Sequence, residues 1–385
     1  MTDTEGAQRL TRLIARDFRN HADLDLGLGR RFVALVGENG AGKTNLLEAI
    51  SLFSPGRGLR RADLATMARE GGPGGFAVSA TLARDGDSHR LGTGIEPPGY
   101  DGRVARVCRI DGGNVPSPIA FAEFLRVVWL TPDLDGLFRG PAGDRRRFLD
   151  RLVLAVDAGH GARVSAMERA LRSRNRILEE RPNDGQWLDA VEREAAELGV
   201  AVALARRETV ERLDRLIAET REDAQPFPWA SVRLEGELDD LVAVWPAVEA
   251  EDRFRVALAR GRHRDRAAGR TLIGPQTTDL TVRHGPKDVP AATASTGEQK
   301  ALLIGLVLAH ARLVQAMSGI APLILLDEVA AHLDPRRRTG LFEALEALPG
   351  QVWMTGADPA MFSELAGRAD VIRIADGRVV APETG

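Results

Sequence analysis

The chain has 385 residues, and its 52 Lys and Arg against 55 Asp and Glu give a formal net charge of −3. This balance excludes a uniformly basic coat, although it permits a local basic face. A composition of 44% hydrophobic and 28% charged residues is that of a folded globular protein. The single cysteine, Cys108, excludes an internal disulfide, and apolar runs such as 301–309 are too short to span a bilayer. With no apolar leader at the N-terminus, we expect a cytoplasmic protein that is not bound to a membrane.

Predicted secondary structure changes in character twice along the chain. Short runs that alternate apolar and polar residues, or that are wholly apolar between turn residues, predict strands. In the first part of the chain they flank one predicted helix at 45–52. From 145 to 224, apolar residues stand three and four apart in a sequence rich in Ala, Leu, Arg and Glu, which predicts amphipathic helices. The strands are predicted at 10–19, 22–28, 31–36, 76–83, 90–95, 104–110, 322–326, 352–355 and 371–374.

This order predicts an α/β domain that a helical insert divides in two. Residues 1–133 form its first half, 134–268 form the inserted helical lobe, and 269–385 form its second half. No internal repeat or low-complexity tract suggests another division.

Residues 37–44 read GENGAGKT and match the Walker A pattern G-x-x-x-x-G-K-[ST] between a predicted strand and a predicted helix. Glycines let successive N–H groups point at phosphate oxygens, and the helix adds its positive end. Lys43 would place a compact ammonium at the β- and γ-phosphates, and Thr44 would bind Mg²⁺. The chain has only three lysines, Lys43, Lys287 and Lys300, so a lysine at this point favours ATP binding over a chance glycine-rich turn. The predicted ATP-binding residues are Gly37, Glu38, Asn39, Gly40, Ala41, Gly42, Lys43 and Thr44.

A second motif, LILLDE at 323–328, has the Walker B form, in which a buried strand carries acids to its carboxyl end. Asp327 would hold Mg²⁺, and Glu328 would act as the general base on the attacking water. The alternative is a strand that simply ends in two solvated acids, which the phosphate loop upstream makes the weaker interpretation.

A third motif, STGEQK at 295–300, opens a long apolar helix. Taken alone, Ser295 and Glu298 predict an ordinary capping box. The order of the motifs, with Leu333-Asp334 last, nevertheless resembles the ABC-type ATPases and in particular the SMC-like heads. That resemblance implies a P-loop ATPase head, with a mixed sheet around the phosphate-loop helix, antiparallel strands and an inserted helical lobe. It also implies a signature that contacts the γ-phosphate bound by a second subunit, and a D-loop. These residues are Ser295, Gly297, Glu298 and Gln299 for the signature and Asp334 for the D-loop.

Within this class the chain resembles the RecF family over essentially its whole length. The likeness lies in DFRN at 17–20, the phosphate-loop block at 37–50, RRRFLD at 145–150, ASTGEQK at 294–300 and GQV at 350–352. It implies an ATP-dependent DNA-binding protein of recombinational repair and replication, whose ATP-driven homodimer clamps duplex or gapped DNA with slow, DNA-stimulated hydrolysis. It also implies action with RecR and RecO to load RecA.

The chain departs from the family at 274–279, where GPQTTD stands in place of G-P-H-R-x-D. The resemblance therefore carries over no phosphate or DNA contact of that His and Arg. From 144 to 176 nine Arg stand against four acids, a local excess that suits a DNA backbone without sequence preference. A solvated, Arg-rich helix face explains the same count equally well, and the resemblance favours DNA. Arg57, Arg60 and Arg61 could line the same face.

Two other functional classes remain open. An ATP-binding subunit of an ABC transporter is disfavoured because no Gln occurs near 129–133 and Thr355 stands at the position of the switch His. The STGEQ signature also differs from the LSGGQ of transporters. An SMC-like structural ATPase would need a long coiled coil, which the insert is too short to supply.

Overall fold

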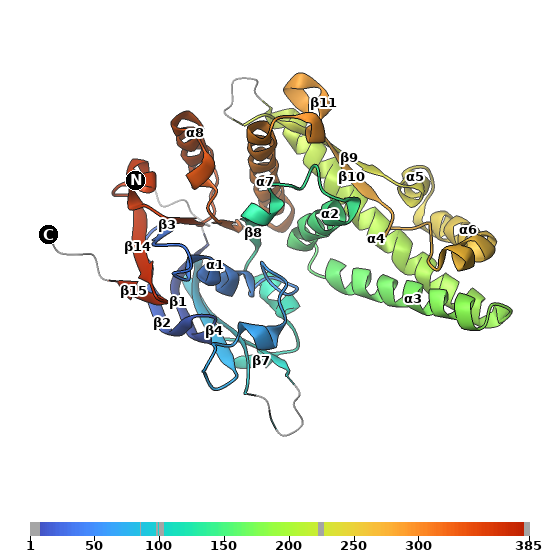
Figure 1. The fold of residues 1–385 in the computed structure, drawn as a ribbon, viewed down its shortest axis with the longest axis horizontal. Helices are drawn as coiled ribbons and strands as arrows, with labels where there is room; N and C mark the ends of the chain where they lie inside the picture. Colours follow the sequence, from blue (N-terminus) through green and yellow to red (C-terminus); the bar gives the residue numbers. More distant parts are fainter. Residues whose placement is uncertain (1–7, 85, 98, 100–103, 222–226, 381–385) are drawn as a thin grey trace. The chain divides into compact units, whose positions relative to one another are not determined.

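A computed structural model describes residues 8–84, 86–97, 99, 104–221 and 227–380 (Figure 1). The chain divides into two compact units. The sheet unit comprises Met1–Asp135, Ala224–Phe227 and Leu303–Gly385, and the helical unit comprises Gly136–Asp223 and Pro228–Leu302. The second boundary falls after Leu302 and not after 268, because strand β10 (Asp279–His284) pairs along its length with β9 (Ala230–Glu235) of the helical unit.

Two six-stranded sheets build the sheet unit, one in the order β2-β1-β4-β5-β6-β7 and the other in the order β15-β14-β3-β13-β12-β8. The first is antiparallel. The second is parallel except at its β14–β15 edge. The strands are β1 (Arg9–Phe18), β2 (His21–Gly27), β3 (Phe32–Val36), β4 (Phe76–Arg84), β5 (Asp87–Ile95), β6 (Arg106–Ile110), β7 (Gly113–Val115), β8 (Val127–Leu130), β12 (Leu323–Leu326), β13 (Val352–Gly356), β14 (Ala369–Ala375) and β15 (Arg378–Val380).

One hydrophobic core joins both of these sheets to helix α1 (Lys43–Ser51). Strand β4 alternates buried and more exposed residues, as expected where one face of an antiparallel sheet meets the core. Strands β3 and β12 are buried throughout, as expected inside a parallel sheet that is covered on both faces. Because β3, β13 and β12 are neighbouring parallel strands, their carboxyl ends meet at one edge of the sheet, where such sheets bind ligands.

The helical unit contains five helices and the small sheet β11-β10-β9 among its described residues. Helices α3 and α4 lie side by side, and α4 also packs against α6 (Figure 1). Small side chains on α4, such as Ala195 and Ala203, are fully buried and let the neighbouring helices approach. The elements are α2 (Ala142–Val156), α3 (His160–Glu180), α4 (Gly185–Thr220), α5 (Glu237–Val244), α6 (Ala247–Ala268) and β11 (Val289–Pro290), besides β9 and β10.

Two further helices are α7 (Thr296–Ser318) and α8 (Pro335–Glu346). Among the described residues, only α7 is long and apolar enough to cross a membrane, with a mean hydropathy of 1.6 in its most apolar window. Because 67% of that window is buried inside the protein, its composition is that of a core helix.

Candidate active site

The phosphate loop depends on two glycines at which no side chain fits. Gly37 has φ +152°, and a Cβ there would lie 2.1 Å from the carbonyl oxygen of Ile374. Gly42 has φ +112°, and its Cβ would lie 2.7 Å from Oδ1 of Asn20. In this loop Glu38, Asn39 and Gly40 are exposed, whereas Ala41, Gly42 and Lys43 are buried. The middle of the predicted loop is thus accessible to a ligand, and its C-terminal part is packed inside the protein.

The ammonium of Lys43 lies inside this loop. Its Nζ donates to the carbonyl oxygens of Gly37 at 2.7 Å and Glu38 at 2.8 Å. An ammonium has three hydrogens, so one remains for a phosphate oxygen. The loop therefore holds a buried cation with hydrogen-bonding capacity to spare.

Asp327, which follows β12, lies between two hydroxyl groups. Thr44 Oγ1 donates to its carboxylate, at 2.8 Å from Oδ1 and 3.1 Å from Oδ2. Thr355 Oγ1 donates to Oδ1 at 2.8 Å and accepts the backbone N–H of Glu328 at 2.8 Å. Thr355 is completely buried. The residue at the position of the transporter switch His therefore orients Asp327 from within the sheet.

Glu328 is half-buried and has a left-handed backbone conformation, with φ +53°. For a residue other than glycine this conformation costs about 1 kcal/mol. Such costs are concentrated at functional sites, where the surrounding structure enforces them. Here the bond from Glu328 N–H to Thr355 holds the strained residue at the end of the strand.

The donor set suits Mg²⁺. No group of three or more His, Cys, Asp and Glu that could hold a metal occurs in the described part of the chain. Mg²⁺ does not require such a group, because it usually takes one or two protein oxygens together with phosphate oxygens and water. The Thr44 hydroxyl and the Asp327 carboxylate supply two oxygens at one point beside the phosphate loop.

The DFRN segment supports the phosphate loop and its helix, a role that its sequence did not reveal. Arg19 donates to both carboxylate oxygens of Glu48 in α1, at 2.7 and 2.8 Å, and the Glu48 side chain is fully buried. Asn20 Nδ2 donates to the Ala41 carbonyl at 3.1 Å, and Asn20 Oδ1 accepts from Asn45 at 2.8 Å.

His21 completes this support and was not among the predicted site residues. Its Nδ1 lies 2.7 Å from the carbonyl oxygen of Gly377, and its Nε2 lies 3.1 Å from that of Gly42. A neutral imidazole can donate to only one of them. Burial of the ring lowers the pKa of His21, against the smaller opposing effect of the two carbonyls. The C-terminal part of the phosphate loop is thus in contact with a titratable side chain.

The signature segment lies in the helical unit and forms the capping box. Ser295 donates from its backbone N–H at 3.0 Å and from Oγ at 2.9 Å to Glu298 Oε2. Ser295 and Gly297 are exposed, whereas Gln299 is buried and donates to the carbonyls of Ala294 at 2.8 Å and Ala292 at 3.2 Å. Gln299 therefore holds the loop in place, and the exposed Ser295 and Gly297 face solvent.

The predicted D-loop residue, Asp334, lies in the sheet unit and caps α8. Its Oδ1 accepts the backbone N–H of Arg337 at 3.0 Å, and its side chain is exposed. One oxygen of this carboxylate thus serves the helix, and the group remains accessible.

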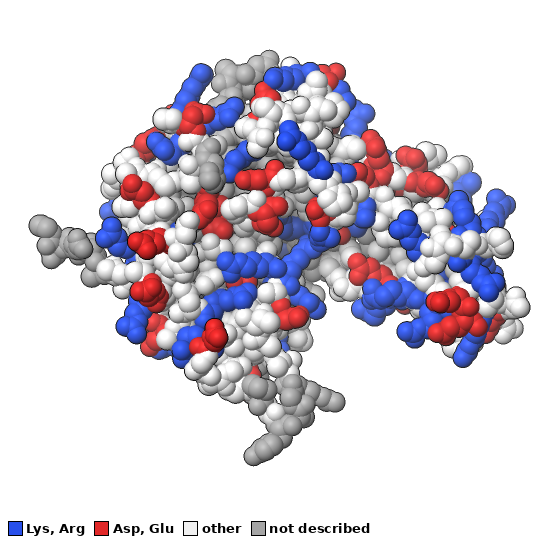
Figure 2. Space-filling model, viewed as in Figure 1, with Lys and Arg blue, Asp and Glu red and all other residues white. Residues whose placement is uncertain are grey.

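Most of the nine arginines between 144 and 176 have partners inside the protein. Arg145 and Arg146 bind Asp279 and the Thr278 carbonyl, and Arg174 is completely buried. Among the described residues, Arg169 and Arg176 of α3 are exposed and make no ion pair or hydrogen bond. Acidic side chains lie among the basic ones over the helical unit on the face in Figure 2. The other pairs in this segment are Arg147 with Asp144, Arg163 with Asp157 and Arg172 with Glu168. Of the arginines predicted to line the same face, Arg57 pairs with Asp63 and Arg60 with Glu48.

The RRRFLD and GPQTTD segments bind each other. Arg145 donates to both carboxylate oxygens of Asp279, at 2.8 and 2.7 Å, and Arg146 donates to the Thr278 carbonyl at 3.0 Å. Asp150 accepts two bonds from Arg206, at 2.8 and 3.0 Å. These two family motifs therefore stabilise the helical unit.

The parallel sheet, the phosphate loop and the acid-bearing strand beside it define a P-loop ATPase head. The family described as "RecF/RecN/SMC N terminal domain" matches residues 9–378. The "DNA replication and repair protein RecF" of Mesorhizobium japonicum is 54% identical over 370 residues, 96% of this chain and 97% of the relative. That of Rhizobium meliloti is 54% identical over 370 residues, 96% and 98% of the two chains. The chain belongs to the RecF family.

The fold comparison agrees with this assignment. A solved structure described as the recombination mediator protein RecF-ATPrS in the RecFOR pathway superposes with a TM-score of 0.84 at 19% identity, covering 98% of this chain and 99% of that one. The predicted α/β ATPase head with an inserted helical lobe is thereby confirmed, and the family model and the two relatives confirm the predicted family.

Proposed function

We propose that the chain is an ATP-dependent, DNA-binding ATPase of recombinational repair and replication, in which ATP joins two copies. The observation that carries the proposal is the meeting of Thr44 and Asp327 beside the Lys43 loop, with Thr355 fixing the carboxylate. These groups have the charges and the unused hydrogen-bonding capacity that binding of a nucleoside triphosphate requires.

In this site, Lys43 and the N–H groups of the loop bind the phosphates, and Thr44 and Asp327 hold Mg²⁺. When bound, Mg²⁺ supplies charge neutralisation between the phosphate groups. Glu328 accepts a proton from the attacking water. Hydrolysis is weak, because the buried Thr355 is already bonded to Asp327 and Glu328 and cannot orient that water.

The nucleotide site is completed by a second copy. Ser295 and Gly297 of one copy meet the γ-phosphate held by the other, and Glu298, Gln299 and Asp334 support this contact. A two-fold axis then creates two equivalent nucleotide sites. Exposure of Ser295 and Gly297 supports this arrangement, because a surface used in trans must be accessible in the single chain.

DNA is the proposed macromolecular ligand, in duplex or gapped form and without sequence preference. Arg169 and Arg176, seven residues apart on α3, provide exposed positive charge that no acid neutralises in the described structure. Such contacts weaken steeply as salt rises. DNA stimulates hydrolysis, and the protein acts in the cytoplasm with RecR and RecO to load RecA.

Binding to gapped and to intact duplex DNA, measured with and without ATP, tests this function. We expect ATP to tighten binding by about tenfold or more, because dimerisation doubles the contacts with the backbone. Lys43→Arg is expected to lose that effect and to retain the ATP-independent binding, since a planar guanidinium cannot replace the compact ammonium. DNA binding that is absent, or that ATP leaves unchanged, would contradict the proposal.

A further inference from the structure

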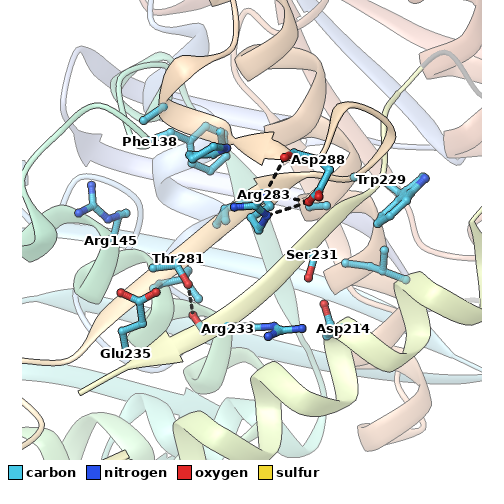
Figure 3. Close-up of a pocket in the computed structure, with 18 of the residues that line it drawn as sticks. Phe138, Arg145, Asp214, Trp229, Ser231, Arg233, Glu235, Thr281, Arg283 and Asp288 are labelled. Carbon is cyan, nitrogen blue, oxygen red and sulfur yellow. Dashed lines mark hydrogen bonds and ion pairs between the residues drawn. The ribbon is translucent and has the colours of Figure 1, made fainter. Parts of the chain in front are cut away.

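A turn in the helical unit presents Lys287 to the first turn of α7. At the end of β10, Arg283 donates to Asp288 Oδ1 from Nε at 3.0 Å and from Nη2 at 2.8 Å. Asp288 has a left-handed conformation, with φ +49°, and closes the turn directly after Lys287. Figure 3 shows the Arg283–Asp288 pair in the wall of a cavity of about 880 Å³. The Arg283–Asp288 pair therefore holds together the turn that carries Lys287.

Lys287 forms an ion pair with Glu298 Oε1. The other carboxylate oxygen, Oε2, accepts the two bonds from Ser295. The bond from Lys287, followed by those from Ser295, lowers the pKa of Glu298 to about 2. Glu298 is thus a carboxylate at neutral pH, and both of its oxygens are engaged.

The Ser295 hydroxyl carries a single proton, which it gives to Glu298 Oε2 at 2.9 Å. A nucleotide phosphate presents only acceptors, so Ser295 can bind it only by withdrawing that proton from Glu298. A carboxylate without a counter-charge would hold the proton more strongly and would also repel the phosphate. The bond to Glu298 Oε2 and the signature contact are therefore alternative uses of the one hydroxyl proton, whereas the cap bond, which Ser295 Oγ accepts from the Glu298 N–H at 3.4 Å, is compatible with either.

We propose that Lys287 is a positioning residue for ATP-driven dimerisation: by neutralising Glu298 it allows Ser295 to transfer its hydrogen bond to the γ-phosphate held by a second copy. The inference rests on the proposed function, in which Ser295 acts in trans. It assigns a role to a second of the three lysines, at a position where a point charge is sufficient.

The ion pair has little importance for folding. The Lys287 and Glu298 side chains are 55% and 24% exposed, and pairs of this kind contribute little to stability. Substitution of Lys287 should therefore change dimerisation without unfolding the protein. Thermal unfolding of each variant supplies that control.

Sedimentation velocity with ATPγS, beside a nucleotide titration, tests the inference on four variants. Lys287→Met should weaken the dimer by about a hundredfold, since a loss of about tenfold per site occurs twice in a symmetric dimer. Lys287→Arg, which keeps the charge, should dimerise like wild type. Adding Glu298→Gln to the Lys287→Met variant should restore dimerisation, because the neutral amide does not repel the phosphate. All of these variants should bind nucleotide normally as monomers.

Ser295→Arg separates the two levels of the proposal. If Ser295→Arg fails to dimerise and Lys287→Met dimerises like wild type, the role of Lys287 is wrong and the trans contact stands. If Ser295→Arg dimerises normally, the trans contact is wrong, and if the wild-type chain stays monomeric, the proposed dimer is wrong. In either case the inference about Lys287 falls. Failure of Glu298→Gln to rescue Lys287→Met would also overturn the neutralisation argument.

Discussion

Two buried cations, Arg174 in the helical unit and Lys43 in the sheet unit, use their hydrogen-bonding groups in opposite ways. In the helical unit, Arg174 is completely buried and binds Glu192 at 2.9 Å and Asp265 at 2.8 Å, besides Thr271 Oγ1 at 2.8 Å and the Leu258 carbonyl at 2.7 Å. In the sheet unit, buried Lys43 binds only loop carbonyls and keeps a hydrogen for a ligand. The cluster around Arg174 is closed, in that its groups bind one another, whereas the site around Lys43 is open, in that one hydrogen is left for a ligand.

This difference shows what distinguishes a site from a structural cluster in a chain rich in arginine. Charge alone does not distinguish a site from a structural cluster, because the helical unit contains many charges that pair with one another. Unused hydrogen-bonding capacity on a buried cation does distinguish them, since such a cation is costly unless a ligand completes it. Opening the cluster around Arg174 and changing single groups at the nucleotide site should therefore have different effects.

The largest effect is expected from Arg174→Ala. It leaves Asp265 buried without a counter-charge, whereas Glu192 keeps its pair with Arg262, and the free energy of unfolding should fall by about 3 kcal/mol. Arg172→Ala on the same helix is the matched control, because its exposed pair with Glu168 is worth about 0.5 kcal/mol. Denaturant unfolding measures both, and equal losses in the two variants would break the comparison.

The next effect concerns Glu328→Gln at the open site. Loss of the general base should slow hydrolysis by about a hundredfold or more. Asp327 and its bonds to Thr44 and Thr355 are untouched, so nucleotide binding should persist and the ATP-bound dimer should accumulate. Phosphate release and sedimentation measure these two properties. Normal hydrolysis in this variant would place the base on another residue.

A smaller effect concerns pH and His21. Burial lowers the pKa of His21, so as pH falls below about 6.5 the unfolded chain takes up a proton before the folded one does. Stability should therefore fall as the pH drops below about 6.5, until the pH passes the folded pKa of His21. His21→Phe should remove this slope, and exposed His263→Gln should keep it. An unchanged slope in His21→Phe would contradict the assignment.

Local patterns in the sequence were sufficient for the strands that carry the phosphate loop and the two acids. Apolar runs that end in glycine or in acids are short-range signals, and the observed β3, β12 and β13 follow them closely. The loop itself is a contiguous motif whose glycines have a direct steric reason. Fold class and motif order could therefore be predicted together.

Pairings between distant residues could not be predicted. Arg145 and Asp279 are 134 positions apart, so neither motif indicated that the other was its partner. Strands β9 and β10 are separated by two helices, which hid the pairing that moves the second unit boundary. Asn20 and His21 act on the loop through side chains to backbone carbonyls, and no pattern in the sequence encodes that contact.

The central claim is that an open site in one copy is completed by Ser295 of another, and Ser295→Ala tests it most directly. The substitution removes a helix cap worth about 1 kcal/mol and leaves the phosphate loop intact. Sedimentation with and without ATP, beside a nucleotide titration, is the measurement. We predict normal ATP binding by the monomer and loss of ATP-driven dimerisation, because a contact made only in the dimer contributes directly to its stability. A variant that dimerises with ATP like wild type would show that Ser295 only caps a helix, and would contradict the account.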